Sequence, residues 1–342
     1  MGGIEFDDSH ASVLDDDGAT LAAASNPVRL GMTVDVQGGD VSTGANGPIA
    51  SASAIQWSRL AVGPVTSVDM ANGTLTVLGQ VLQSNGSTVY DAAIRGGLTG
   101  LHAGDAVCAY ALADALGRPV ATRIELASAS EPWRLRGFAS SVDAQTRRLV
   151  VGSAQLDYGT ATNPPADLMA GQFVHLRING AGVNGVLQVG SFLPSTRAPS
   201  DAARVVTEGV VAAPVAGVSF RLGALSVDAR TASVSPQGAT WAAGEQVQVQ
   251  GHLQGGSFVA EAITVISPQG KAKRTYQLVG SPSSLDLVAQ TFVVRGVGVD
   301  YGAAQFVNGT LASLSAANVT VRVQGTLSAD GSRVRAQVVS FP

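Results

Sequence analysis

The densest group of side chains that could do chemistry is an acidic cluster near the start of the chain. It contains Asp7, Asp8 and the run at 15–17, with Glu5 and His10 beside it. Hard cations such as Ca²⁺ bind several carboxylate and carbonyl oxygens gathered in one turn. The cluster is therefore the first place to look for a metal site.

The candidate calcium ligands are Asp15, Asp16 and Asp17, which precede Gly18. They lack the spaced D-x-[DN]-x-[DN]-G pattern and the distal Glu of a dedicated calcium loop. The alternative is a solvated hairpin turn without metal. Weak calcium binding is the only cofactor that the sequence suggests.

The remaining chemistry-bearing residues form no recognisable constellation. No two of the four histidines have the spacing of a metal-ligand pair, and we expect them on the surface or in turns. The sequence has no G-x-S-x-G motif and no Walker-type loop. We therefore predict no catalytic residue and no enzyme. The histidines are His10, His102, His175 and His252.

Charge and cysteine content narrow the classes of partner. The chain of 342 residues has a net charge of −4 and only 13% charged residues, so it lacks the basic face expected of a nucleic-acid-binding protein. The one basic cluster, at 271–274, suits a linker. Cys108 is the single cysteine and lies in the apolar run 106–110, which predicts a packed thiol.

The sequence predicts no transmembrane segment. It contains no run of about 18 apolar residues. The first residues, 1–4, also lack the charged and apolar regions of a signal peptide. We expect no signal or lipid anchor within this chain.

A repeated segment is the main indicator of the fold. The pattern is Gly-x-x-Val-x-Val-x-Gly, and its copies begin about 70 residues apart. The third residue after each start is Val in all five copies. The starts are Gly31, Gly104, Gly171, Gly244 and Asn318.

The single Asn among these starts is informative. Asn is the residue other than Gly that best tolerates a positive φ. We therefore predict a left-handed residue before each strand. Polar residues such as Gln246, Gln248 and Gln250 alternate with the valines, which indicates strands with one buried and one wet face.

Two more glycine anchors recur in each repeat and divide it into about five short strands. So few short strands cannot form a large sandwich, and closure into a small barrel removes exposed edges. We predict an all-β tandem array of five OB-like barrel modules, with a small two-sheet sandwich as the alternative. The anchors are Gly63, Gly137, Gly209 and Gly280, and Gly79, Gly152, Gly223 and Gly296.

The module boundaries follow from these repeats and from polar linkers. An aromatic residue precedes three of the opening glycines, where it would either pack neighbouring modules together or offer a ligand platform. These residues are Trp57, Trp133 and Tyr276. The predicted divisions are a partial module 1 (1–56), module 2 (57–130), module 3 (131–194), a linker (195–204), module 4 (205–267) and module 5 (268–342).

The first repeat is incomplete. Gly2 or Gly3 matches the mid-hairpin glycine of the later repeats, so the opening strand is missing. Such a module has an open edge at Ile4 and Phe6. Either the sequence is trimmed at this end, or the gap accepts a strand from a partner or from another copy.

These motifs resemble a bacterial family known only as a domain of unknown function, number 5666. The matching segments are the V-x-x-V-D of 65–69, the T-L-T-V-x-G of 74–79, the L-x-x-G of 101–104 and the A-x-x-I of 121–124. The resemblance implies an envelope-linked or secreted bacterial protein, often with a lipoprotein-type signal. It implies no activity and no catalytic residues.

Three classes of function remain for comparison. The first is a non-catalytic, extracytoplasmic structural or spacer protein that associates with itself or with another envelope protein. The second is a binding module for a glycan, a protein or another envelope ligand; the third is an enzyme. We expect the first, located in the periplasm, on the outer-membrane surface or outside the cell. The sequence leaves open whether the modules form a rod or fold back on one another.

Overall fold

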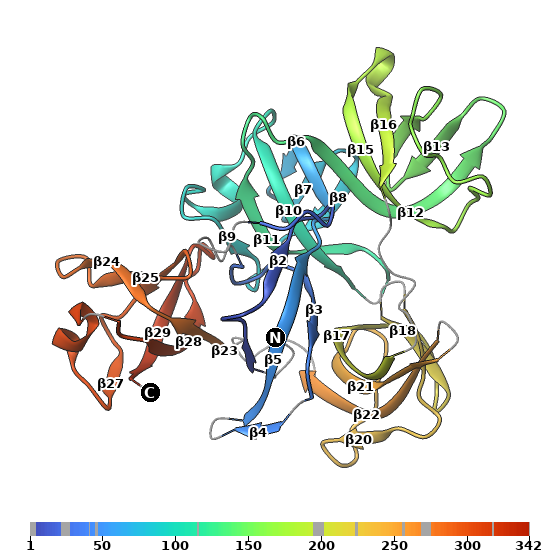
Figure 1. Cartoon of the computed structure of the whole chain (residues 1–342). Helices are drawn as coiled ribbons and strands as arrows, with labels where there is room; N and C mark the ends of the chain where they lie inside the picture. Colours follow the sequence, from blue (N-terminus) through green and yellow to red (C-terminus); the bar gives the residue numbers. More distant parts are fainter. Residues whose placement is uncertain are drawn as a thin grey trace.

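The computed structural model of the chain consists of β-strands joined by turns and three short 3-10 helices (Figure 1). Ile4, the basic cluster at 271–274 and most of the predicted linker at 195–204 lie outside the residues that the structure describes. None of the helices within the described ranges could span a bilayer. The described ranges are 5–21, 28–40, 42–44, 47–114, 116–193, 202–222, 225–254, 257–267, 275–316 and 318–341.

Module 3 shows the basic architecture of one repeat. Its first strand pairs antiparallel with the second and the fourth, and its third strand pairs parallel with the fifth. Each strand therefore has two neighbours, and the sheet closes into a five-stranded, OB-like barrel. The strands are β12 (Trp133–Asp143), β13 (Arg148–Val151), β14 (Ala154–Asp157), β15 (Phe173–Ala181) and β16 (Leu187–Leu193).

Modules 2 and 4 repeat this closed arrangement and add one short strand beside the last. Strand β17 begins inside the stretch predicted as a linker. Module 2 contains β6 (Ala61–Asp69), β7 (Thr74–Val77), β8 (Gln80–Gln83), β9 (Val89–Tyr90), β10 (Ala106–Ala113) and β11 (Pro119–Leu126). Module 4 contains β17 (Ala202–Val215), β18 (Ser219–Leu222), β19 (Leu225–Asp228), β20 (Ser233–Ser235), β21 (Gln246–Gln254) and β22 (Ser257–Ser267).

Module 5 has the same topology with its opening strand split in two. Its first half pairs with β28 and its second half with β25. The strands are β23 (Thr275–Gly280), β24 (Pro282–Asp286), β25 (Thr291–Val294), β26 (Val297–Asp300), β27 (Gln305–Val307), β28 (Val321–Leu327) and β29 (Arg333–Ser340). The predicted array of small barrels is confirmed for these four modules.

Module 1 is an open version of the same barrel. Strand β5 is the common neighbour: β1 and β2 pair with it in parallel, and β3 and β4 pair with it antiparallel. The strands are β1 (Glu5–Asp7), β2 (Ser12–Leu14), β3 (Val34–Gly38), β4 (Ser42–Gly44) and β5 (Gly47–Trp57).

The glycine that starts each repeated segment adopts the predicted left-handed conformation. The φ angles are 85° at Gly31, 97° at Gly104, 89° at Gly171, 90° at Gly244 and 57° at Asn318. A side chain at these positions meets the carbonyl oxygen of its own residue, which disfavours residues other than Gly and Asn. The prediction drawn from the single Asn is confirmed.

A substitution at Gly171 isolates this backbone effect. A Cβ atom there would meet nothing within 4 Å, so Gly171→Ala changes only the conformational energy. We expect it to lower the free energy of unfolding by about 1–2 kcal/mol, measured by urea denaturation. Asn318→Gly is the matched control and should change stability by a few tenths of a kcal/mol at most. Equal effects of the two variants would contradict the explanation.

The opening glycine of each complete module lies opposite the repeated valine. Gly63 pairs with Val107, and Gly137 pairs with Val174. At Gly137 an added Cβ would come within 2.5 Å of Val151 Cγ1. The missing side chain therefore lets the opening strand bend inward and close the barrel. The same pairing recurs between Gly209 and Val247 and between Gly280 and Val321.

The hydrophobic cores follow the modules only in part. Modules 2 and 3 share one continuous core, because β6 and β12 pair directly and place Leu135 opposite Ala61. Module 4 has its own core. The core of module 5 includes Val89 from module 2. The repeat is thus periodic in the sequence, but the cooperative units of packing are not all single modules.

The modules do not form a straight line. Module 5 folds back against module 2, where the backbone N–H of Tyr90 donates to the carbonyl of Gly331 at 3.0 Å, and its Arg322 pairs with Glu5 near the start of the chain. Strand β5 of module 1 runs through the middle of the molecule, with module 5 on one side, module 4 on the other and modules 2 and 3 above (Figure 1). The open alternatives of rod and folded-back array are resolved in favour of the second.

Candidate functional site

The acidic cluster lies at the junctions between modules, with Asp16 at its centre. The Asp16 side chain is fully buried, and one carboxylate oxygen accepts a hydrogen bond from the guanidinium of Arg59. The other oxygen accepts the backbone N–H of Arg59 at 2.9 Å and lies 3.5 Å from Nη2 of Arg136. One carboxylate of module 1 thereby connects the segment before β6 with strand β12 of module 3.

Arg59 extends this network to the side of module 2. Its Nη2 lies 3.0 Å from Oε1 of Glu131, and its Nη1 contacts Sγ of Cys108 at 3.3 Å. Its guanidinium also lies 5.7 Å from the ring centre of Trp57, a cation–π distance. Arg59 is almost fully buried, and these contacts offset its desolvation.

Asp17 binds two arginines of module 3. Its carboxylate accepts from Nε of Arg134 at 3.1 Å and from Nη2 at 2.7 Å, and it also accepts from Nη2 of Arg177 at 2.8 Å. Burial opposes ionisation of Asp17, but the hydrogen bonds and charges of Arg134 and Arg177 outweigh it and lower its pKa to about 2. The carboxylate is therefore held in its charged form.

This depressed pKa predicts an acid-dependent part of the stability. An unfolded Asp titrates near a pKa of 3.9, so the contribution of Asp17 is complete above that value and is lost as the pH falls towards 2. Because the side chain is partly open to solvent, we expect about 1 kcal/mol. Asp17→Asn should remove this part of the pH profile in urea denaturation, whereas Asp167→Asn should leave it unchanged. If wild type and Asp17→Asn lost the same stability between pH 4 and pH 2, this role of Asp17 would be refuted.

Glu5 and Asp8 make the corresponding contacts with module 5. Glu5 pairs with both terminal nitrogens of Arg322 at 2.9 and 3.1 Å, and Asp8 pairs with those of Arg295 at 2.6 and 3.0 Å. Arg295 also donates from Nε to the carbonyl of Val279 at 2.7 Å. Paired hydrogen bonds of this kind fix the orientation of both partners. We call Glu5, Asp8, Asp16 and Asp17 the acidic clasp, because each joins module 1 to another part of the chain.

Asp15 has a different role from its two neighbours. Its Oδ1 accepts the backbone N–H groups of Asp17 and Ala19, each at 2.9 Å, and so shapes the turn. Among the described residues, no three His, Cys, Asp or Glu side chains form a group that could hold a metal ion. The predicted solvated turn fits Asp15 but is wrong for Asp16, which is buried. Calcium binding stays a prediction. A rise in the urea concentration at the unfolding midpoint on addition of Ca²⁺ would support it.

The three aromatic residues singled out at module junctions all lie against apolar side chains. Trp57 packs on Val62, Cys108 and Tyr110 of module 2. Trp133 packs against the shared core of modules 2 and 3.

Tyr276 belongs to the core of module 5. Its hydroxyl donates to the carbonyl of Ser87 in module 2 at 3.3 Å. Trp57 ends strand β5 of module 1 in the structure, so Trp57 and Tyr276 each contact a neighbouring module directly.

The predicted partner-strand edge is described only at Phe6. This residue pairs with Ala50 across a parallel ladder, and its ring lies inside the open barrel near Gly38. Ile4 lies outside the described residues.

Two other sequence predictions have clear outcomes. Cys108 is buried, as predicted, and burial raises the pKa of its thiol to about 11.

His175 was expected on the surface, but it is buried with 2% of its surface exposed. It lies on β15 opposite Arg136, where modules 1 and 3 meet, so the expectation from alternation alone is wrong.

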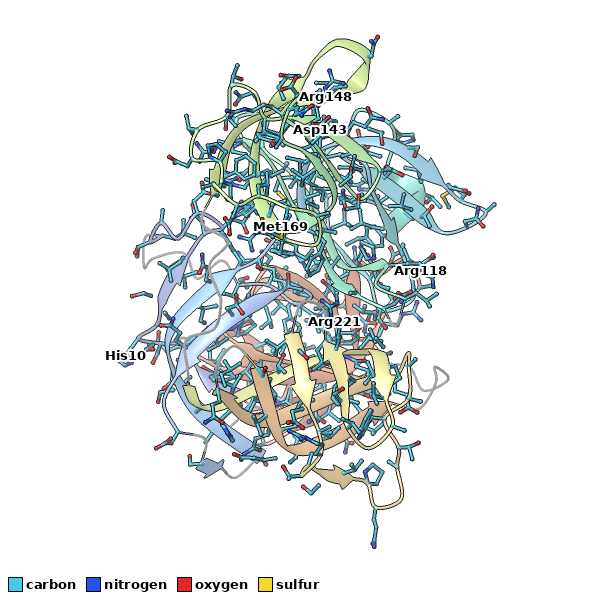
Figure 2. The ribbon with its side chains drawn as sticks, turned by 90° about the vertical axis from the view of Figure 1, so that its right-hand side faces the viewer. His10, Arg118, Asp143, Arg148, Met169 and Arg221 are labelled. Carbon is cyan, nitrogen blue, oxygen red and sulfur yellow. The ribbon has the colours of Figure 1, made fainter. Side chains whose placement is uncertain are left out.

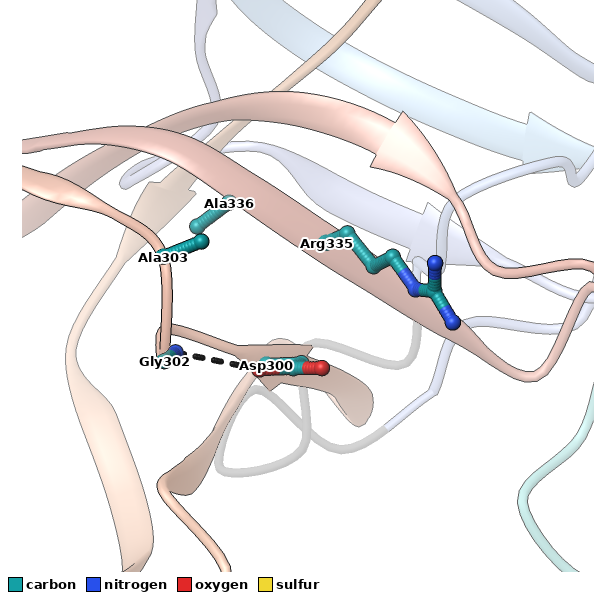
Figure 3. A pocket seen from close by; sticks show the side chains of 5 residues that line it. All are labelled: Asp300, Gly302, Ala303, Arg335 and Ala336. Atoms are coloured by element: carbon teal, nitrogen blue, oxygen red, sulfur yellow. Dashed lines mark hydrogen bonds between the residues drawn. The ribbon is translucent and has the colours of Figure 1, made fainter.

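The described surface also has an open hollow in module 5, with a volume of about 310 Å³. It is lined by Asp300, Gly302, Ala303, Arg335 and Ala336. The Asp300 carboxylate accepts the backbone N–H of Gly302 at 3.0 Å, and the Arg335 side chain extends away from Ala303 (Figure 3). The Asp300 carboxylate thus stabilises a turn. None of the five lining residues was predicted from the sequence to belong to a site.

A pair of exposed aromatic rings lies where module 3 faces module 4. Phe138 and Phe173 are each 40% exposed and meet edge to face with ring centres 5.2 Å apart. Arg221 of β18 lies 5.8 Å from the ring centre of Phe138. Figure 2 shows Arg221 at the side of module 4 that faces module 3, whereas His10 lies on the outer surface of module 1.

Sequence reasoning found the acidic residues but not their partners. The arginines of the clasp are separated from the acids by up to 317 positions, so no local pattern links them. One feature of the sequence could have pointed to them. Arg134, Arg136 and Arg322 each lie in a strand whose neighbouring residues are apolar. An arginine within an apolar strand is rarely buried without an acidic partner.

Comparison with known proteins gives one family and a distant structural match. No curated protein matches the chain. A solved structure described as "drosophila Unr CSD456" aligns with 13% identity and a TM-score of 0.18, covering 62% of this chain and 98% of that chain. Residues 62–125 and 208–264 match the family described as Domain of unknown function (DUF5666). Modules 2 and 4 thus each contain a segment that matches the DUF5666 family.

Proposed function

We propose that the chain is a non-catalytic structural protein of the bacterial cell envelope, acting outside the cytoplasm as a pre-assembled block of β modules. The observation that supports this most directly is the acidic clasp. Four carboxylates of module 1 bind arginines of β12, β15, β28 and the segments beside β6 and β25. Such contacts fix modules 1, 2, 3 and 5 relative to one another, as a load-bearing or spacing element requires.

Most of the reactive side chains near module 1 are already engaged in contacts within the chain. Asp16 and Asp17 are engaged by guanidinium groups, and the Cys108 thiol is held in its neutral form by burial. An enzyme needs convergent polar groups in a pocket that substrate can enter. In the clasp, the Asp16 side chain is fully buried and that of Asp17 is 20% exposed, both against guanidinium groups, which favours a mechanical over a chemical role.

Small-angle X-ray scattering tests the structural proposal. A fixed, folded-back chain of this length should have a radius of gyration near the roughly 20 Å of a compact protein. The double variant Asp8→Asn/Glu5→Gln should free module 5 from module 1 but leave its contacts with Val89 and Ser87 of module 2, so it should raise this radius slightly, whereas Asp167→Asn should not. An extended wild-type particle with independently moving modules would contradict the proposal. Fractionation of the producing bacterium tests the location, and recovery in the cytoplasm would refute it.

A binding role is the second candidate, because one observation favours it. The exposed Phe138–Phe173 pair with Arg221 beside it provides an aromatic and cationic surface of the kind that holds sugars or protein side chains. Retention of the protein on isolated cell-envelope material would test this role. Loss of retention in Phe173→Ser, with normal retention in Met70→Ser, would support it over the purely structural one.

A further inference from the structure

Module 5 docks onto module 2 through a hairpin turn and a tyrosine side chain. The turn between β28 and β29 contains Gly331, whose carbonyl accepts the backbone N–H of Tyr90 at 3.0 Å. The hydroxyl of Tyr276 donates to the carbonyl of Ser87 at 3.3 Å. Val89 of module 2 packs into the core of module 5. We call Ser87, Val89 and Tyr90 the receiving face of module 2, and the turn that contains Gly331 the docking turn of module 5.

Module 5 contains a counterpart of this receiving face. Tyr90 lies on β9, which runs parallel to β11, and Phe306 has the same register on β27, which runs parallel to β29. Ala303 precedes Phe306 by three positions, as Ser87 precedes Tyr90. Tyr90 is 4% exposed, whereas Phe306 is only partly buried and Ala303 is exposed. The face that is covered in module 2 is therefore more exposed in module 5.

The hollow of about 310 Å³ in module 5 lies on this exposed face (Figure 3). Its lining includes Ala303, the counterpart of Ser87. On module 2, Tyr276 contacts the carbonyl of Ser87. Phe306 stacks on Phe341 with ring centres 6.4 Å apart, so the hollow around Ala303 is the part of the face that stays open. The hollow thus lies where, on module 2, a neighbouring module is bound.

The turn between β10 and β11 gives module 2 a counterpart of the docking turn. The two turns are closed by corresponding pairs of backbone hydrogen bonds. Gly117 takes the place of Gly331, and their φ angles are 76° and 69°. Gly331 is buried in its contact with module 2, whereas Gly117 is exposed and Leu116 beside it is 75% exposed. Module 2 thus presents a docking turn at the surface, with an apolar residue at its tip.

We infer that the receiving face of module 5 binds the turn at Leu116 of a second copy of the chain. The Leu116 side chain suits the hollow because Ala303 and Ala336 line it with apolar atoms. The guanidinium of Arg118, whose side chain is 69% exposed, carries the charge opposite to that of Asp300 in the lining. The contact repeats between copies the one that joins modules 5 and 2 within the chain.

This interface joins two different surfaces. Each copy offers one receiving face and one docking turn, so copies add head to tail into a ring or an open chain. Figure 2 shows Arg118 of the turn at the edge of the molecule, on the opposite side of the view from His10. The inference goes beyond the structural role, since it depends on modules 2 and 5 and not on the acidic clasp.

Sedimentation velocity of the full chain over a range of concentrations tests this inference. The weight-average sedimentation coefficient should rise with concentration as copies add head to tail. Leu116→Asp places a charge at the apolar tip and Ala303→Arg fills the hollow, so each should weaken association by about tenfold or more. Met70→Asp changes an exposed residue at a different turn of module 2 and should associate as the wild type does.

A mixture of the two variants distinguishes a head-to-tail contact from a symmetric one. Leu116→Asp keeps its receiving face and Ala303→Arg keeps its docking turn, so one interface can still form between them. The mixture should give dimers and no larger species, while each variant alone stays monomeric. Raising the concentration of the wild type should also slow amide hydrogen exchange at Gly117 and Ala303.

The inference fails if the wild type stays monomeric at all concentrations, and a compact scattering radius for that monomer would leave the structural role intact. It fails as well if association survives unchanged in either variant, or if their mixture forms no dimer while circular dichroism shows both folded. Should a variant not fold, unchanged exchange at Gly117 and Ala303 in the associated wild type decides against these surfaces.

Discussion

Asp16→Ala is expected to lower the free energy of unfolding by about 3–5 kcal/mol. The substitution leaves the guanidinium groups of Arg59 and Arg136 buried without their shared carboxylate, and an uncompensated buried charge carries a cost of that size. The Asp16 side chain is fully buried, and those of Arg59 and Arg136 are 7% and 11% exposed. Urea denaturation followed by tryptophan fluorescence measures the change.

Hydrogen exchange should locate this loss of stability at the junction rather than throughout the chain. Amides of β5 and of β12 should exchange faster in Asp16→Ala, and those of module 4 should not change. Asp167→Ala, at an exposed aspartate, is the matched control and should stay within about 0.5 kcal/mol of the wild type. A comparably small effect of Asp16→Ala would mean that the clasp does not stabilise the junction.

Leu135→Ala is expected to destabilise modules 2 and 3 together by about 2–5 kcal/mol. Leu135 is fully buried in their shared core and lies opposite both Leu176 of module 3 and Ala61 of module 2. Truncation removes buried apolar surface and leaves a cavity. Because the two modules share this core, the hydrogen-exchange rates of backbone amides in β6 and β15 should rise by the same factor.

Two variants provide the comparison for this prediction. Leu116→Ala, at a side chain that is 75% exposed, should change stability little. Phe220→Ala removes a buried ring from the separate core of module 4 and should destabilise that module alone. If Leu135→Ala affected module 3 without module 2, the two modules would be independent folding units despite their shared sheet.

The sequence was sufficient for the architecture of a single module. Positive φ at the repeat starts, alternation along β21 and closure into a small barrel all follow from local rules about Gly, Asn and β-branched residues. These rules act within a few residues, so one copy of the pattern contains them. The repeat of the pattern then supplied the number of modules.

The candidate site was found only in part. The acidic residues were identified, but two explanations for them, calcium binding and a solvated turn, both treated the cluster as local. The binding partners of Asp17 are Arg134 and Arg177, 117 and 160 positions away. Ion pairs at such separations depend on how modules are placed, which local pattern does not specify.

By itself, the sequence determined what each module is: a short, one-sided β ribbon bent by glycine into a barrel. Only the tertiary structure decided how the modules combine, that modules 2 and 3 share a core, that module 5 returns to module 1, and that His175 is buried. The physical reason is the separation along the chain over which each interaction acts. Backbone preference and hydrophobic alternation act between neighbouring residues, whereas the clasp and the open edge of module 1 depend on surfaces that meet only after each barrel has formed.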